Sequence, residues 1–189
     1  MQKEYSKSFF FGVLILVLSA CGSTKELTEL TTPFLNCKMD LTLSTAEGEK
    51  KIPAVIQLIR GSEMKVSLRA PMLRSELGIL EYSMNDVVLV DRTNRIFASG
   101  KYMEVKQKYR ELVSFETIQS ILESAASNRQ KRKLSGASLG WDVFGVKSLK
   151  LTSFTTSPFE LRPFVPSSRY EEVDVDFFIR VLKMQLADQ

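Results

Sequence analysis

Histidine is absent from the 189 residues of this chain. Without it, Ser-His-Asp and Cys-His catalytic arrangements and histidine-ligated metal sites are excluded. Carboxylates remain as candidate catalytic groups, and they are densest at Glu171, Glu172, Asp174 and Asp176. We interpret this group as acidic residues flanking a helix start, where negative charge is favourable. A carboxylate-based hydrolase is the least favoured alternative, and we expect a protein that is not an enzyme and uses neither a cofactor nor a metal.

Cysteine occurs only twice, at Cys21 and Cys37. If Cys21 is modified, as argued below, Cys37 is left alone and no internal disulfide can form, even in an oxidising compartment. Cys37 stands at the beginning of an alternating apolar pattern. We therefore expect a buried and inert thiol rather than a reactive one.

The longest apolar run, residues 8–20, is short and follows Lys3 and Lys7. A membrane-spanning helix needs about 20 apolar residues, whereas a basic flank with a shorter apolar stretch is typical of a secretory signal peptide, here residues 1–20. The segment LSAC, residues 18–21, resembles the bacterial lipobox, whose cysteine is acylated and becomes the first residue of the mature chain. An ordinary signal peptide and an uncleaved membrane anchor are the alternatives.

Acylation of Cys21 predicts a protein anchored to a membrane outside the cytoplasm. Acyl chains contribute about 0.8 kcal/mol per buried methylene, so several of them hold a protein firmly on a bilayer. Gly22 and Ser23 follow the cysteine. By resemblance to lipoprotein-sorting rules, the lack of an aspartate there favours the outer membrane, with the domain on its periplasmic face. We interpret residues 21–34 as a polar tether.

The positive charge of the chain is modest. The formal net charge of +4 falls to +3 when residues 1–20 are removed, and we expect no nucleic-acid partner. Basic residues gather at Arg129, Lys131, Arg132 and Lys133, within a polar stretch, residues 125–140, that we interpret as a loop. A solvated loop is the favoured interpretation of this group, and contact with anionic lipid headgroups is the alternative.

Residues 35–189 are long enough for one domain with a core of its own. Alternating apolar residues predict strands over residues 38–44, 51–60, 63–71, 76–84, 86–92 and 94–100. A connector with some helix follows in 101–109, and helical spacing predicts helices over 113–124, capped near Ser114, and about 173–186. Between these helices, strands are expected in 141–146, 147–154 and 159–166. This order predicts an α+β fold, in which a curved antiparallel sheet, an incomplete β-barrel, is covered on one face by a few helices.

Residues 64–105 resemble the lipoprotein carrier and receptor superfamily of LolA and LolB, and more closely their uncharacterised lipoprotein relatives in Gram-negative bacteria. The shared features are a strand ending in Ala70-Pro71, the strand–turn–strand ELGILEYSMNDVVLVD, the segment SGKY at 99–102, a helix starting near Ser114, and FVPSSRYEEVDVDFFIRVL at 164–182. The resemblance implies an incomplete barrel closed by a helical lid, around a cavity that takes the acyl chains of lipoproteins. Because LolB-type receptors project an apolar loop residue near the membrane, it also implies that Met72 and Leu73 face the membrane.

The apolar face of the expected sheet supplies the candidate ligand-binding residues. They are Ile56, Leu58, Met64, Val66, Leu68, Ile79, Val88 and Val90 from the strands, with Phe115 and Ile118 from the helix; Phe177 and Val181 of the last helix could also face the sheet. Taken alone, these residues favour a filled core, since protein interiors pack as densely as crystals, and the resemblance is what favours a cavity. We expect an acyl chain or a lipoprotein as the partner, with a structural or accessory lipoprotein of an envelope complex as the alternative.

Overall fold

The computed structural model describes residues 32–45, 48–72, 75–109, 114–142 and 145–187. The chain divides into two units at Thr32 and Pro33, and all the described elements belong to the second. The expected signal peptide, Cys21 and most of the tether lie outside the described residues.

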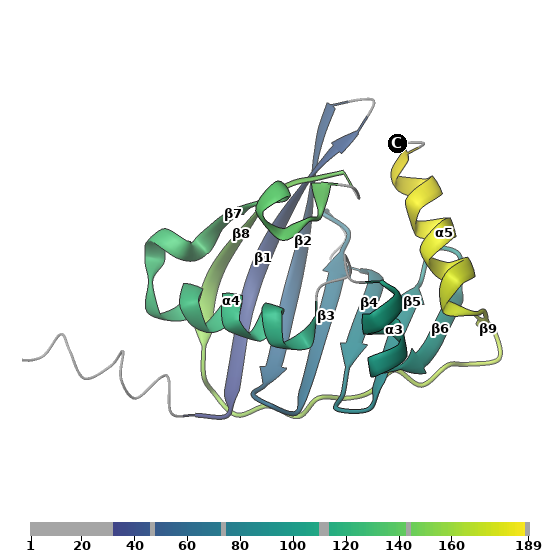
Figure 1. Ribbon diagram of the computed structural model, residues 1–189, viewed down its shortest axis with the longest axis horizontal. Coiled ribbons are helices and arrows are strands. Elements are labelled where there is room, and N and C mark those ends of the chain that lie inside the picture. The colour runs from purple at the N-terminus through teal and green to yellow at the C-terminus, as the bar shows by residue number, and fades with distance from the viewer. Residues whose placement is uncertain (1–31, 46–47, 73–74, 110–113, 143–144, 188–189) are drawn as a thin grey trace, which may run out of the picture. The chain divides into compact units, whose positions relative to one another are not determined.

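Six strands form an antiparallel meander in which each strand pairs with the next along the chain (Figure 1). Their bounds are β1 (Phe34–Thr45), β2 (Gly48–Ile59), β3 (Glu63–Arg69), β4 (Glu76–Tyr82), β5 (Asp86–Asp91) and β6 (Ile96–Lys101). Each overlaps a strand that the apolar alternation predicts, so these six predictions are confirmed.

Three later strands complete one sheet in the order β7-β8-β1-β2-β3-β4-β5-β6-β9. They are β7 (Lys133–Ser135), β8 (Val146–Thr155) and β9 (Glu171–Glu172). All pairs are antiparallel except β6 with β9. The described chain is thus an α+β fold with one mixed, mostly antiparallel sheet of nine strands, not closed, and three α-helices.

The three helices are α3 (Tyr102–Lys108), α4 (Phe115–Ser127) and α5 (Val175–Ala187). Figure 1 shows α3 and α4 in front of the sheet and α5 beside β6. The Ser114 side chain accepts a hydrogen bond from the Thr117 N–H at 3.2 Å, which is the N-cap that the sequence predicts. None of the helices within the described ranges is long and apolar enough to cross a membrane.

The predictions of strands in 159–166 and 141–146 are wrong. Residues 156–170 contain neither helix nor strand, and the prolines at 158, 163 and 166 explain this because they lack the N–H that a sheet ladder requires. Strand β8 begins at Val146, so the described residues of 141–145 are not a strand either. Conversely, the stretch 125–140, expected to be a loop, contains the end of α4, two 3₁₀ turns and β7.

The sheet has one face toward the helices and one away from them, and the pairing register shows which side chains share a face. Met64 lies opposite Tyr82, and Val66 opposite Leu80, so the even-numbered residues of β3 and β4 share the helix side. Ile79 lies opposite Val90, and Glu81 opposite Val88. The prediction that Ile79, Val88 and Val90 face the helices with Val66 is therefore wrong, because a shift of one residue moves every side chain of a strand to the other face.

The core lies between the helix side of the sheet and the helices. It includes Leu35, Cys37, Ile56, Leu58, Met64, Tyr82, Val87, Leu122, Ala125, Leu151, Phe178 and Ile179. Cys37 is 1% exposed, and burial raises the pKa of its thiol to about 12. The prediction of a buried cysteine is confirmed, and its low reactivity stays a prediction that the raised pKa supports.

Candidate functional site

Helix α4 covers the part of the sheet that contributes most of the predicted ligand-binding residues (Figure 1). Its apolar residues recur at positions 118, 121, 122 and 125, so one face of the helix packs against the sheet. Ile118, Leu122 and Ala125 on this face are buried. Of the predicted residues, Ile56, Leu58, Met64, Val66 and Ile118 are buried in this core, while Leu68 and Phe115 are partly buried against it. The structure therefore brings these seven together and leaves Ile79, Val88 and Val90 on the opposite face.

Helix α4 is attached to the β2–β3 turn by two polar contacts. The Gly61 N–H donates a hydrogen bond to Oε1 of Gln119 at 2.8 Å. Arg60 Nε lies 3.2 Å from Oε1 of Glu123, one helical turn further on. Both helix residues lie on the same side of α4 because positions four apart share a face. These contacts fix the position of the helix relative to the β2–β3 turn.

The first turn of α4 is also attached to the start of α3. The Tyr102 hydroxyl donates to Oε2 of Glu116 at 2.7 Å and accepts from the Phe115 N–H at 3.0 Å. Lys106 Nζ lies 3.1 Å from the same carboxylate oxygen. The hydrogen bond from Tyr102 is the main cause that lowers the pKa of Glu116 to about 2. The Tyr102 pKa is raised, first by burial and then by its bond to Glu116.

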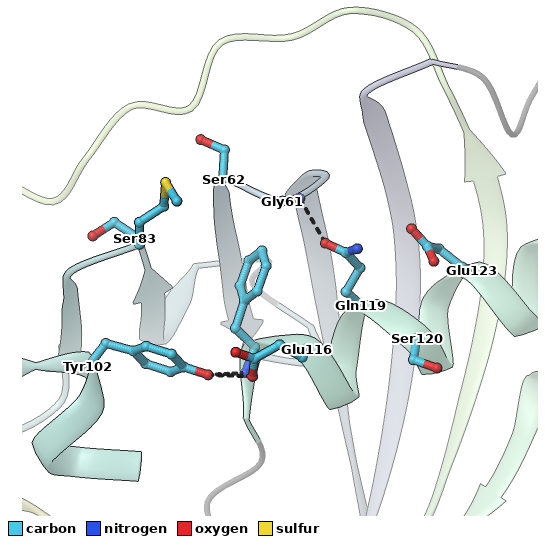
Figure 2. A pocket seen from close by; sticks show the side chains of 10 residues that line it. Gly61, Ser62, Ser83, Tyr102, Glu116, Gln119, Ser120 and Glu123 are labelled. Carbon is cyan, nitrogen blue, oxygen red and sulfur yellow. Dashed lines mark hydrogen bonds between the residues drawn. The ribbon is translucent and has the colours of Figure 1, made fainter.

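A pocket of about 320 Å³ opens between these attachments (Figure 2). Its walls come from the β2–β3 turn, the β4–β5 turn, the start of α3 and residues 115–123 of α4. It is lined by Gly61, Ser62, Ser83, Met84, Tyr102, Phe115, Glu116, Gln119, Ser120 and Glu123. The rim is polar, whereas Phe115 leads inward to the core, where its ring lies 6.5 Å from that of Tyr82.

Only Phe115 among the pocket residues was a predicted ligand-binding residue. A usable signal was present, because residues 61–62 and 85–86 are both turn-like in the sequence. Alternate turns of a meander lie at the same end of the strands, which brings the two turns together. Tyr102 and α4 also line the pocket at this end of the strands, but their positions depend on contacts that no local sequence pattern specifies.

The acidic group near the C-terminus has structural partners. Glu171 and Glu172 form β9, beside β6, rather than flanking the helix start. Glu172 accepts a hydrogen bond from the Ser99 hydroxyl at 3.1 Å, and Asp174 accepts one from the Phe177 N–H at 2.7 Å as a helix cap. Asp176 accepts hydrogen bonds from Lys108 and Tyr109 and so connects α5 to α3. Among the described residues no group of acidic or cysteine side chains is arranged to hold a metal ion.

The basic stretch 129–133 is only partly free for other contacts. Arg132 donates from Nε to the Ala125 carbonyl at 2.9 Å, and its guanidinium lies 4.7 Å from the Phe154 ring centroid. This arginine thus satisfies a carbonyl at the C-terminal end of α4. Arg129, Lys131 and Lys133 are exposed, as expected for a solvated group.

The loop expected to face a membrane follows β3. Met72 is 93% exposed, whereas Leu73 lies outside the described residues.

The face away from the helices is crossed by residues 156–170, which we call the strap. Lys65 and Glu81, 2.8 Å apart and about 15% exposed, hold its backbone. Lys65 Nζ donates to the Arg162 carbonyl at 2.8 Å, and Glu81 accepts from the Phe164 N–H at 2.9 Å. The Phe159 ring packs on Phe34 of β1, and the Phe164 ring on Phe97 of β6. The strap thus lies on the same face of the sheet as Ile79 and Val90.

No model of a known protein family matches the chain, and no curated protein matches it at a significant level.

Proposed function

We propose that this protein is a lipid-anchored protein of the outer membrane, on its periplasmic face, that binds an acyl chain non-covalently between the sheet and α4. The N-terminal signal pattern with Cys21 supports the anchor. The open, mostly antiparallel sheet with one helix-covered apolar face is compatible with the incomplete barrel of LolA-like and LolB-like carriers, which the sequence resembles.

The observation that carries the proposal is the position of Phe115. It lines a pocket of about 320 Å³ on one side and packs against the core beneath α4 on the other. Ligand sites commonly combine apolar walls with a few polar groups. In this pocket Phe115 and Met84 are the apolar side chains, and serine, glutamate and glutamine side chains surround them. An acyl chain would enter beside Phe115 and displace α4 from the helix side of Val66 and Leu68, with no nucleotide, metal or covalent step.

The test is direct binding of a fluorescent fatty-acid analogue to the mature chain in which Cys21→Ser prevents acylation. Leu68→Asn places a polar group on the helix side, and Val88→Asn places the same group on the strap side of a nearby strand. Both parent side chains are partly buried, which makes them a matched pair. We expect about tenfold weaker binding for Leu68→Asn, because an unpaired buried amide costs roughly 1–3 kcal/mol, and little change for Val88→Asn.

A second candidate function is a structural or accessory lipoprotein with a filled interior. The observation that favours it is the closeness of the packing under α4, where Leu58, Leu122 and Ala125 are at most 1% exposed. It predicts no saturable uptake of the fatty-acid analogue by the parent chain and recovery of a protein partner on cross-linking in intact cells. Saturable uptake with equal effects of Leu68→Asn and Val88→Asn would instead place the ligand elsewhere.

A further inference from the structure

One edge of the sheet receives the chain from the N-terminal unit. The Pro33 carbonyl accepts a hydrogen bond from the Arg60 N–H at 2.8 Å, which places the start of the domain beside the β2–β3 turn. The Tyr102 N–H donates to the Asn85 carbonyl at 2.8 Å and joins the start of α3 to the β4–β5 turn. We call this side, formed by Pro33, Arg60–Ser62, Ser83–Asn85 and Lys101–Met103, the tether edge.

The tether edge carries two large apolar side chains that nothing in the described residues covers. Met84 is 73% exposed and Met103 is 66% exposed, and each is next in sequence to a partner of the Asn85–Tyr102 hydrogen bond. Met84 also lines the pocket beside α4. The basic side chains of this edge, Arg60 and Lys101, are paired with Glu123 and Asp86. An apolar and flexible side chain, rather than basic charge, is what this edge offers to a partner.

We propose that the anchored domain rests on the bilayer through the tether edge, with Met84 and Met103 in contact with the lipid surface. The proposal rests on the proposed function, because it requires the acyl anchor at Cys21. It deepens that function by giving the pocket a source of ligand: its mouth, next to Met84, would open at the bilayer from which an acyl chain is drawn.

The length of chain between the anchor and the domain favours this edge over Met72. Cys21 and Pro33 are twelve residues apart, so they are separated by at most about 40 Å. Met72 follows the opposite end of β3, and the strand steps from Gly61 to Ala70 span about 30 Å. To bring Met72 to the bilayer, the tether would have to run back along the domain at about three quarters of its full extension, at a cost in chain entropy. Contact through the tether edge requires no such extension.

The experiment uses the mature acylated protein in phosphatidylcholine vesicles that carry a nitroxide quencher at the headgroup. Single variants Met84→Cys, Met103→Cys and Met72→Cys replace exposed side chains and accept an environment-sensitive dye, and the buried Cys37 stays unlabelled. We expect loss of most of the fluorescence at positions 84 and 103 and none at 72. Deleting residues 25–31 shortens the reach of the tether to about 17 Å and should leave quenching at 84 unchanged.

Three results would overturn the proposal. Quenching at 72, alone or with the others, would place the far end of β3 at the lipid. Vesicles that float with the protein but quench no position would show an anchored domain held away from the surface, which refutes the tether edge and leaves the anchor intact. Protein that does not float, with an unmodified Cys21 by mass spectrometry, would refute the anchor of the proposed function and this orientation with it.

Discussion

The Tyr102 hydroxyl donates a hydrogen bond to Glu116 at 2.7 Å, and so the first residue of α3 holds the first turn of α4. The two residues belong to helices whose connection includes residues outside the described ranges. Tyr102 itself is buried against Tyr82, with ring centroids 5.8 Å apart. Through Tyr102, the bond therefore attaches the helix that covers the proposed acyl site to the sheet.

Tyr102→Phe should destabilise the fold by about 1–2 kcal/mol, because it removes a bond to a carboxylate and leaves the Phe115 N–H without its acceptor. The pH dependence of the stability of this variant tests whether Tyr102 acts through Glu116. The Glu116 pKa is lowered from 4.5 to about 2, so the stability this group contributes is present above about pH 4.5 and is lost as the pH falls toward 2. Glu116 is 60% exposed, and solvent screening keeps this contribution small. Urea unfolding at pH 7 and pH 3 should show a smaller acid loss for Tyr102→Phe than for the parent; equal losses would contradict the assignment.

Glu81→Gln should loosen the strap. The substitution weakens the bond to the Phe164 N–H and leaves the Lys65 ammonium, 16% exposed, without its anionic partner. A cost of about 2 kcal/mol is expected for a charge-assisted contact of this burial. Glu49→Gln is the matched control, because the Glu49–Lys147 pair is more than half exposed and solvent screening should make its contribution clearly smaller. Denaturant unfolding gives both values, and limited proteolysis within 156–170 should accelerate only for Glu81→Gln.

Gly136→Ala should destabilise the protein by more than about 2 kcal/mol. A Cβ built on Gly136 would lie 1.6 Å from the Val146 carbonyl oxygen, so the turn before β8 would have to move away from β7. The backbone of Gly136 is in the ordinary helical region, with φ −57°, and the effect is therefore steric rather than conformational. Ala137→Gly, at the exposed neighbouring position, should cost at most about 1 kcal/mol. A drop in melting temperature that is equal for the two variants would contradict this explanation.

Cys37 should resist thiol reagents at pH 8 in the folded protein. Its side chain is 1% exposed, and a pKa of about 12 leaves almost no thiolate to react. In denaturant the same thiol should react at an ordinary rate, so labelling with a maleimide followed by mass spectrometry reports global unfolding. Rapid labelling of the folded, Cys21→Ser chain would show that the sheet opens locally at β1.

The amino-acid sequence by itself determined the elements whose signals are local. Alternating apolar residues specified β1 to β6, and the Ser114 side chain specified the start of α4. The same alternation placed Cys37 and Ile56 in the core, because β1 and β2 have one dominant apolar face.

Tertiary structure decided the features that depend on distant residues. Strands β4 and β5 carry apolar side chains on both faces, one toward the helices and one on the face that the strap crosses. Alternation alone does not say which of these faces Ile79 joins. The contacts that hold the strap join residues 97 and 83 positions apart, and those that close the pocket join Gly61 to Gln119. A local pattern records which residues are apolar; only the folded chain determines which surface each of them meets.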